Sequence, residues 1–212
     1  AVDVGGARLL SDLYVHREAH GRGVGRQLLA AVLHGAEARY TFASNDPAAL
    51  PLYARAGMLA RWPLLSMRGA AAALPDGAVA AEVSVEEAAA HELLLTGQDR
   101  SSTYRYWAGR APSRTVEVVR GGRRVAVAAV HVGDGGTRVE HLFCEPVDAV
   151  VALGAVAALF QSAHVHVYAP GCQWMSVALM ERGFVIDDTQ VFMASAAEVV
   201  HPLLQVVHPG LG

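Results

Sequence analysis

The stretch from residue 9 to residue 33 constrains the fold more than any other part of this sequence. An apolar run, Leu9-Leu-Ser-Asp-Leu-Tyr-Val15, is typical of a β-strand, and the segment 27–33 has leucines and valines at helical spacing. Between them lie Gly21, Gly23 and Gly25. A strand, a glycine-rich turn and a helix in this order point free backbone N–H groups at one spot, where the helix dipole favours an anion. The sequence therefore predicts a turn that binds phosphate, most readily a diphosphate.

Charged and apolar residues around the turn agree with this prediction. Arg22 and Arg26 add positive charge beside the expected anion site. The helix that follows is expected to bury one apolar face. That face consists of Val24, Leu28, Leu29, Val32 and Leu33.

Composition limits the partners and the compartment. The net charge of −3 and the lack of a basic cluster argue against nucleic acid as a partner. No apolar run approaches the roughly 18 residues that span a bilayer, and no signal peptide is recognised, so we expect no membrane partner. Cys144 and Cys172 occupy expected core positions, so we expect no disulfide and a cytoplasmic location. All 17 basic residues are arginine, which is typical of a GC-rich genome and fits a bacterial source.

The spacing of the glycines decides between two kinds of phosphate loop. A dinucleotide-binding fold requires Gly-x-Gly-x-x-Gly. The segment His20-Gly-Arg-Gly-Val-Gly-Arg26 resembles instead the Arg/Gln-x-x-Gly-x-Gly/Ala coenzyme A loop of the GCN5-related N-acetyltransferases. Downstream, Asp46-Pro-Ala-Ala-Leu-Pro-Leu-Tyr53-Ala-Arg-Ala-Gly57-Met58 is similar to that family's Asn-x-x-Ala-x-x-Leu-Tyr-x-x-x-Gly-Phe helix. The resemblance covers residues 7–68.

The resemblance implies an α/β fold with a mixed, mostly antiparallel sheet flanked by helices. The chain starts inside that fold, so the first copy, residues 1–69, is expected to lack its N-terminal elements. After a linker at 70–77, residues 78–195 resemble a second, degenerate copy, followed by a tail at 196–212. Glu145 and Asp148 stand where the first copy has glycines, and Leu179 stands where it has Tyr53. We therefore expect a tandem protein with one working site.

The same resemblance implies a set of cofactor-binding residues. Acetyl-CoA would be the co-substrate, with no metal, and the acetyl group would pass directly to an amine of a small molecule or peptide. Backbone groups of Tyr14 and Val15 would pair with the pantetheine arm and the acetyl carbonyl. Asp46 would either contact the cofactor or only cap the helix, while Asn45 contacts the cofactor. The diphosphate would be held by His20, Gly21, Arg22, Gly23, Val24, Gly25 and Arg26.

Two residues are candidates for catalysis. Tyr53 matches the tyrosine that protonates the departing thiolate in many family members; the alternative is a core tyrosine on an amphipathic helix. The strand Ser11-Asp12-Leu-Tyr-Val15 resembles the Glu-Asp-Leu/Ile-Tyr-Val strand of the spermidine/spermine acetyltransferases, but Ser11 replaces the glutamate. Asp12 then remains to attract or deprotonate the amine, or is an exposed residue that pairs with an arginine.

Other interpretations stay open at this point. A non-catalytic acyl-CoA-binding or regulatory module would explain the loss of the glutamate at Ser11. His164 and His166 share one face of a strand, but without a Cys or His pair at ligand spacing we favour cross-strand packing over a metal. The stretch 98–107 either walls the acceptor pocket or forms an ordinary helix with an aromatic face. A homodimer is compatible with the sequence.

Overall fold

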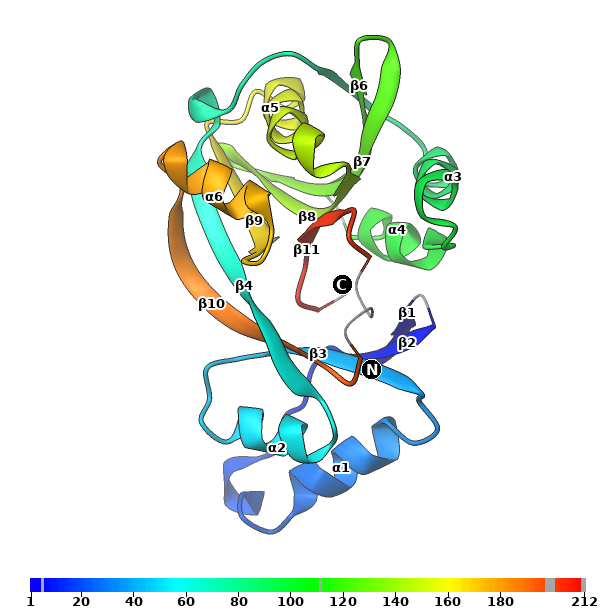
Figure 1. The fold of residues 1–212 in the computed structure, drawn as a ribbon, viewed down its shortest axis with the longest axis vertical. Coiled ribbons are helices and arrows are strands. Elements are labelled where there is room, and N and C mark those ends of the chain that lie inside the picture. The colour runs from blue at the N-terminus through cyan, green and yellow to red at the C-terminus, as the bar shows by residue number, and fades with distance from the viewer. Residues whose placement is uncertain (5, 111, 197–200, 211–212) are drawn as a thin grey trace. The chain divides into compact units, whose positions relative to one another are not determined.

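The computed structural model describes residues 1–4, 6–110, 112–196 and 201–210 (Figure 1). The chain forms two compact units. Unit 1 comprises Ala1–Leu64, Thr189–Val200 and Pro209–Gly212, and unit 2 comprises Leu65–Asp188 and His201–His208. Each unit is therefore built from more than one segment of the chain. The sequence instead predicted one domain before the linker at 70–77 and one domain after it.

Unit 1 contains a mixed sheet built from the predicted strand–turn–helix segment. Strands β1 (Val2–Val4) and β2 (Ala7–Leu10) form an antiparallel hairpin. Strand β2 runs parallel to β3 (Ala38–Ala43), with pairs from Ala7↔Ala38 to Leu10↔Thr41. The end of β10 (Val185–Ala194) pairs antiparallel with β3 through residues 191–194. A parallel pair linked through a helix is the arrangement that an α/β fold requires.

Two helices cover one face of this sheet. Helix α1 (Val24–Val32) follows the glycine turn, and α2 (Ala49–Arg55) precedes β4 (Leu59–Ala70). Leu28 was expected on the apolar face of α1 but is 42% exposed, so the buried face is narrower than predicted. The core between the helices and the sheet consists of Leu10, Leu29, Leu33, Ala43, Tyr53, Met58 and Met193.

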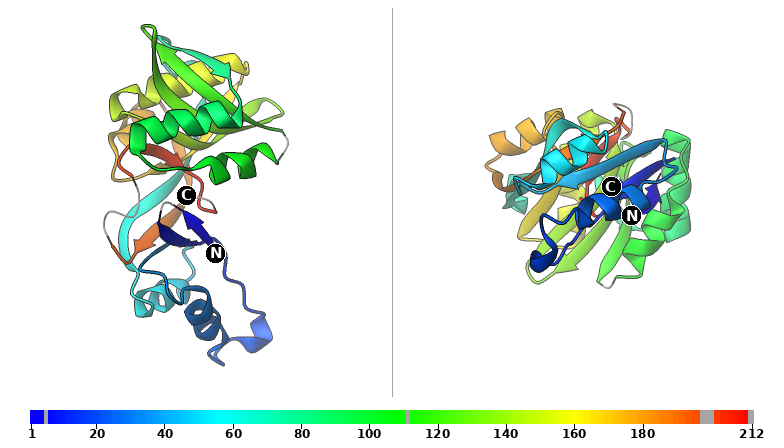
Figure 2. Two further views of the ribbon diagram at one scale, coloured as in Figure 1. Left: turned by 90° about the vertical axis from the view of Figure 1, so that its right-hand side faces the viewer. Right: turned by 90° about the horizontal axis from the view of Figure 1, so that it is seen from below.

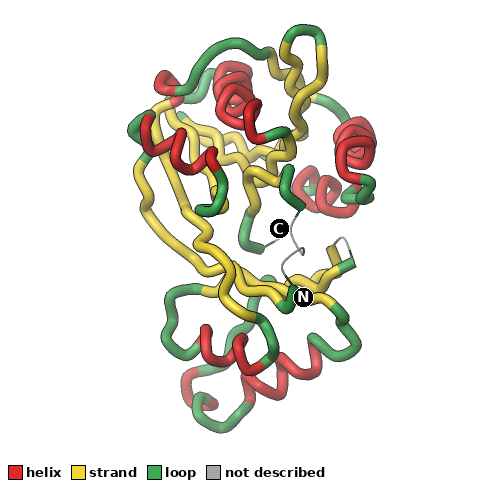
Figure 3. Tube along the Cα trace, in the orientation of Figure 1, coloured by secondary structure: helices red, strands yellow, loops and turns green. Residues whose placement is uncertain are grey.

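The strand before the glycine turn is shorter than predicted. We expected it to continue to Val15, but β2 ends at Leu10, where its pairing with β3 also ends. The hydroxyl of Thr41 donates to the Leu10 carbonyl over 2.8 Å, and the chain then leaves the sheet. In Figure 3 the segment up to α1 is loop apart from the short helix η1 (Arg17–Ala19). The backbone of residues 11–16 therefore makes no ladder bonds to β3.

The start of α2 also differs from the prediction. Asp46 and Pro47 were expected to be the N-cap and the first helical residue, but the N-cap is Ala48. The Asp46 carboxylate accepts a hydrogen bond from the Ala48 N–H over 2.8 Å, and the Asp46 carbonyl accepts from Ala49 N. Asp46 therefore forms a turn that leads into the helix. Gly57 ends the helix at φ +83°, as predicted.

Unit 2 contains a larger sheet in which neighbouring strands run in the order β9-β8-β7-β6-β5. All neighbours are antiparallel except β8 and β9, which are parallel from Gly136↔His164 to Val139↔Val167. Every element predicted for 83–194 is present within a few residues. The strands are β5 (Val79–Glu82), β6 (Ser113–Arg120), β7 (Arg123–Gly133), β8 (Gly136–Cys144) and β9 (His164–Pro170); the helices are α3 (Val85–Thr96), α4 (Ser101–Ala108), α5 (Ala149–Leu159) and α6 (Trp174–Glu181), with short turns η2 (Ala71–Ala73) and η3 (Pro146–Asp148).

The helices of unit 2 pack in two ways, one set against an apolar core and the other around a buried polar cluster. The side that packs against α5 and α6 is apolar and includes Val139, Leu142 and Leu153. Helices α3 and α4 lie side by side (Figure 2) and contribute a buried polar cluster. In it, Glu92 accepts hydrogen bonds from Tyr104 over 2.6 Å and from His141 over 2.9 Å. The stretch 98–107 thus largely forms an ordinary helix, one of the two alternatives.

The predicted C-terminal tail contains a strand. Strand β11 (Leu204–Val207) pairs antiparallel with β8 at Leu204↔Phe143, Val206↔Leu142 and Val207↔His141. Strand β9 pairs with β8 only as far as Val139, so β11 takes the next part of the same edge (Figure 1). Residues 197–200, also in the predicted tail, lie outside the described part of the chain.

Only one of the two cysteines lies in the core. Cys144 is buried, as expected, but Cys172 is exposed because it lies in the turn between β9 and α6, and both are free thiols. Burial raises the pKa of the Cys144 thiol.

Of the helices in the described ranges, none combines the length and apolar character needed to cross a membrane.

Candidate functional site

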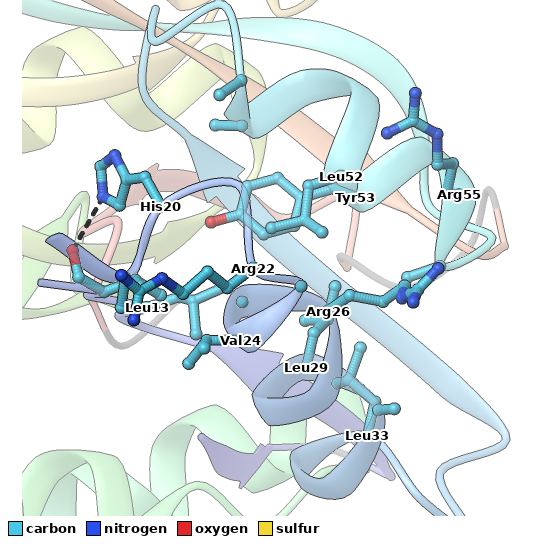
Figure 4. A pocket seen from close by; sticks show the side chains of 18 of the residues that line it. Leu13, His20, Arg22, Val24, Arg26, Leu29, Leu33, Leu52, Tyr53 and Arg55 are labelled. Atoms are coloured by element: carbon cyan, nitrogen blue, oxygen red, sulfur yellow. Dashed lines mark hydrogen bonds between the residues drawn. The ribbon is translucent and has the colours of Figure 1, made fainter. Parts of the chain in front are cut away.

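The glycine turn opens onto a cavity of about 1220 Å³ within unit 1 (Figure 4). Its walls are the turn, both helices and the loop after α1. Sites for drug-sized ligands usually measure about 300–1,000 Å³. The cavity is therefore large enough for a ligand bigger than a typical small metabolite.

The turn adopts the conformation that its glycines permit. Gly21 has φ +76°, and Gly23, the N-cap of α1, has φ +78°. The first backbone bond of the helix runs from Gln27 N to Gly23 O over 3.1 Å, so the N–H groups of residues 24–26 precede the helical ladder. A Cβ on Gly25 would lie 3.5 Å from Val15 Cγ2 and 3.6 Å from Leu52 Cδ2. The turn thus presents amides at a helix N-terminus, where an anion is favoured.

Arginine dominates the charge of this cavity. Of the described residues that line it, four are arginines and one, Asp46, is a carboxylate. A guanidinium nitrogen of Arg26 lies 3.8 Å from the position that a Cβ on Gly23 would take. The arginines are Arg22, Arg26, Arg39 and Arg55. This excess of fixed positive charge favours a ligand that carries several negative charges.

Two of these arginines were missed from the sequence. Arg55 follows Tyr53 by two residues on α2, and Arg39 is the second residue of β3, beyond the end of α1. The position of Arg55 in the last turn of an amphipathic helix could have indicated it. Arg39 could not be found from the sequence, because only the fold brings the start of β3 to the same cavity.

Tyr53 points into the cavity, with its hydroxyl toward the side where His20 and Arg22 lie (Figure 4). The residue is 9% exposed. Burial raises the pKa of Tyr53 above its ordinary value, and the negative charges of Asp46 and Asp12 raise it further. The phenol is therefore held in its protonated form, in which it can donate a proton.

The segment between β2 and the turn reaches the cavity through alternate residues. Leu13 and Val15 line it, whereas Asp12 is exposed and Tyr14 is 86% exposed outside the lining. The Val15 carbonyl accepts a hydrogen bond from His20 Nε2 over 2.9 Å. His20 therefore lies at the cavity with its ring bonded to the protein backbone.

The comparisons with known proteins fit this geometry. Residues 2–57 match the acetyltransferase (GNAT) domain. This match covers β1 through α2, and thus the glycine turn and Tyr53. A search of the curated proteins found no match to the chain.

Solved structures show a similar, GNAT-like fold over most of the chain at low sequence identity. A GCN5-related N-acetyltransferase from Anabaena variabilis superimposes with a TM-score of 0.61 at 13% identity, over 90% of this chain and 56% of that one. One from Kribbella flavida gives 0.56 at 18% identity, over 90% and 53%. A tandem GNAT protein from the clavulanic acid biosynthesis pathway gives 0.55 at 16% identity, over 89% and 75%. The chain spans little more than half the length of the first two relatives.

The segment that resembles the GNAT helix motif is only partly directed at the cavity. Asp46 lines it, in the turn before α2. Asn45 instead donates its side-chain amide to the Thr189 carbonyl over 2.7 Å. Within the described ranges, no group of three or more His, Cys, Asp or Glu side chains is arranged to hold a metal ion.

Proposed function

We propose that the protein is an N-acetyltransferase that moves an acetyl group from acetyl-CoA to an amine of a small molecule or peptide. The observation that carries this proposal is the arginine-lined cavity at the N-terminus of α1, with a protonated tyrosine in its wall. GNAT domains transfer acyl groups from acyl-CoA, and the matched region contains this cavity's turn and tyrosine.

Each main part of acetyl-CoA has a matching set of groups at the cavity. Amides from Gly21 to Arg26 would bind the diphosphate, with Arg22 beside it. Arg26, Arg39 and Arg55 supply charge for the phosphate on the adenosine. The pantetheine arm would lie along the backbone after Leu10, where β2 has left β3. The N–H groups of Tyr14 and Val15 would then be offered to the arm, because the Val15 carbonyl is bonded to His20. Asp46 lines the cavity, whereas the Asn45 amide is bonded to Thr189, so Asn45 would contact the cofactor only through its side-chain oxygen.

The reaction would proceed by direct attack. The amine nitrogen attacks the thioester carbonyl, a C–N bond forms, the C–S bond breaks, and the thiolate takes a proton from Tyr53. Holding amine and thioester in line can lower the barrier by about 7–11 kcal/mol, and N–H groups near Val15 would stabilise the oxyanion. Asp12, exposed beside the site, would attract the amine and accept its proton, directly or through water.

We also propose that the chain contains two related folds with one working site. In each unit a strand runs parallel to the next, linked by a turn and a helix: β2, α1 and β3 in unit 1, and β8, α5 and β9 in unit 2. In unit 2 the turn carries Glu145 and Asp148 in place of glycines, and Leu179 replaces the tyrosine. Strand β11 occupies the edge of β8 that corresponds to the edge of residues 11–16.

A second candidate function is a regulatory module that binds acyl-CoA without turnover. Ser11 favours it, because a glutamate at this position is the proton acceptor in the resembling strand. Where the resembling strand has a glutamate followed by an aspartate, this chain has Ser11 followed by Asp12, so Asp12 is the one carboxylate of the two.

The two functions are separated by measuring release of CoA from acetyl-CoA with a panel of polyamines, aminoglycosides, amino acids and peptides. We expect turnover with at least one amine, and thermal stabilisation by CoA in the absence of any amine. Stabilisation without turnover on the whole panel would favour the regulatory module. Absence of both would reject the site itself.

Matched arginine variants test the binding mode. Arg26→Gln removes a charge beside the turn, whereas Arg17→Gln removes an exposed charge from η1, outside the cavity. We expect Arg26→Gln to weaken acetyl-CoA binding by about tenfold and to reduce its dependence on salt. Equal effects of the two variants would indicate general electrostatic attraction instead of a built site.

A further inference from the structure

Unit 2 contains a second cavity, of about 590 Å³, which the proposed function does not use. Four strands contribute side chains to it: Arg68 from β4, His131 from β7, Arg138 from β8 and His166 from β9. His164 also lines it. Its volume lies within the about 300–1,000 Å³ of small-molecule sites.

We propose that this cavity binds the phosphate group of a small molecule. Donors that approach from four strands can surround a tetrahedral dianion, whereas one arginine fork suffices for a planar carboxylate. Gly133 and Gly183 also form parts of the wall, and a Cβ on either would meet no atom within 4 Å, so a ligand can approach the backbone there.

Two acidic groups near this cavity, Glu140 and Asp187, are already engaged. Arg138 donates from Nε to Glu140 over 2.6 Å, which leaves its two terminal nitrogens for a ligand. Arg68 Nε lies 3.4 Å from Asp187, which also accepts a hydrogen bond from Ser66 over 2.5 Å. Asp134, exposed in the β7–β8 turn, is the one carboxylate among the described lining residues.

A hydrogen-bond chain fixes the tautomer of His166. The single hydroxyl proton of Ser66 goes to Asp187, so Ser66 Oγ must accept from His166 Nε2, 2.8 Å away. A further proton on the ring therefore goes to Nδ1. Asp187 thus supports, through Ser66, a cationic form of His166 that would add one charge for a phosphate.

The histidines report the positive potential of the cavity. The pKa of His131 lies below its ordinary value because of burial and the charges of Arg138 and Arg110. Burial also lowers the pKa of His166. The charge of Asp187 raises this pKa, and the charges of Arg138 and Arg68 offset part of that rise. A bound dianion would offset these arginines, so both pKa values should rise on binding.

The test follows the histidine side chains by NMR during titration with inorganic phosphate, AMP and citrate, with sodium chloride at equal ionic strength as the reference. We expect phosphate and AMP to shift the resonances of His131 and His166 and to raise their pKa values. The proposal is overturned if neither phosphate nor AMP acts beyond the chloride reference, or if citrate alone does. These readouts do not depend on acetyl transfer.

A pair of variants locates the binding. Arg68→Gln removes an exposed arginine of the cavity, and Arg124→Gln removes an exposed, ion-paired arginine of β7 outside it. We expect Arg68→Gln to weaken phosphate binding by about tenfold and Arg124→Gln to leave it unchanged. His131→Asn, on another strand, should weaken it as well. Equal weakening by Arg68→Gln and Arg124→Gln would overturn the assignment.

Discussion

His20 Nε2 donates a hydrogen bond to the carbonyl oxygen of Val15 over 2.9 Å. This bond ties the glycine turn to the segment that leaves the sheet after β2. Both parts line the same cavity, so the bond fixes the distance between the proposed sites for the diphosphate and for the pantetheine arm.

Loss of this bond should weaken cofactor binding. A typical intramolecular hydrogen bond contributes about 0.5–1.5 kcal/mol, so we expect His20→Ala to raise the KM for acetyl-CoA by roughly threefold to tenfold. Steady-state kinetics with varied acetyl-CoA measures this. His16→Ala is the control, because His16 is exposed outside the cavity. An equal effect of both substitutions would contradict the assigned role of His20.

Tyr53→Phe should lower kcat more than it changes the affinity for acetyl-CoA. General acid catalysis contributes about 10²–10⁴-fold, and the ring remains to fill its place in the core. The pKa of Tyr53 is raised, so activity should persist through neutral pH and fall only above the ordinary tyrosine pKa of 10.0, as the phenol ionises.

Asp12→Asn tests whether this fall in activity at high pH, the basic limb of the pH profile, comes from Tyr53. Removing the negative charge of Asp12 lowers the pKa of Tyr53, so the basic limb of kcat should move to lower pH. If Tyr53→Phe reduces kcat and affinity equally, or leaves the basic limb in place, Tyr53 is not the acid.

Glycines of the turn should differ in their tolerance of a side chain. Gly23 has φ +78°, where an L-residue costs roughly 1–2 kcal/mol. Gly25 has ordinary dihedrals, and a Cβ there would make normal van der Waals contacts with Val15 and Leu52. We expect Gly23→Ala to lower the thermal midpoint and Gly25→Ala to maintain it. A Gly25→Ala protein that is stable but binds acetyl-CoA poorly would indicate a ligand in close contact at that position.

The buried cluster around Glu92 should control the acid stability of unit 2. Arg100 Nε lies 3.3 Å from Glu92, which also bonds Tyr104 and His141. Burial alone would raise the pKa of Glu92, but His141, Tyr104 and Arg100 lower it overall. Its contribution to stability is therefore present above the unfolded value of about 4.5 and is lost as the pH falls through the lower folded-state pKa.

Chemical denaturation of Glu92→Gln measures this contribution. Removing one partner of a buried ion pair costs about 3–5 kcal/mol, and we expect the difference from the unsubstituted protein to shrink below pH 4.5. Glu86→Gln, an exposed position on the same helix, should change stability by less than about 0.5 kcal/mol. A Glu92→Gln protein as stable as this control would refute the role of the cluster.

Local signals in the sequence were sufficient where neighbouring residues decide the structure. The glycine turn and its helix, the stop at Gly57 and the helix that starts at Ser84 follow from conformational freedom and capping. Ser84 and Glu87 form the reciprocal capping bonds that their spacing predicts.

Long-range pairing decided the parts that were missed. The run from Leu9 to Val15 has the composition of one strand, but β3 pairs with β2 only as far as Leu10. The run Leu204-Gln-Val-Val207 resembles a short strand, yet nothing near it in sequence indicates that it pairs with β8. Arg39 reaches the cavity only because β3 starts next to the end of α1. The roles of the site residues remain predictions for the variants above.

Strand β11 pairs with the C-terminal half of β8, at residues 141–143, and so provides that edge with a neighbour from the same chain. A tethered segment acts at an effective concentration of the order of millimolar or more. A diffusing extended ligand would have to compete with it before making its first main-chain bond. Access to this edge therefore depends on how often β11 detaches, whereas no strand of the described residues pairs with the backbone after Leu10.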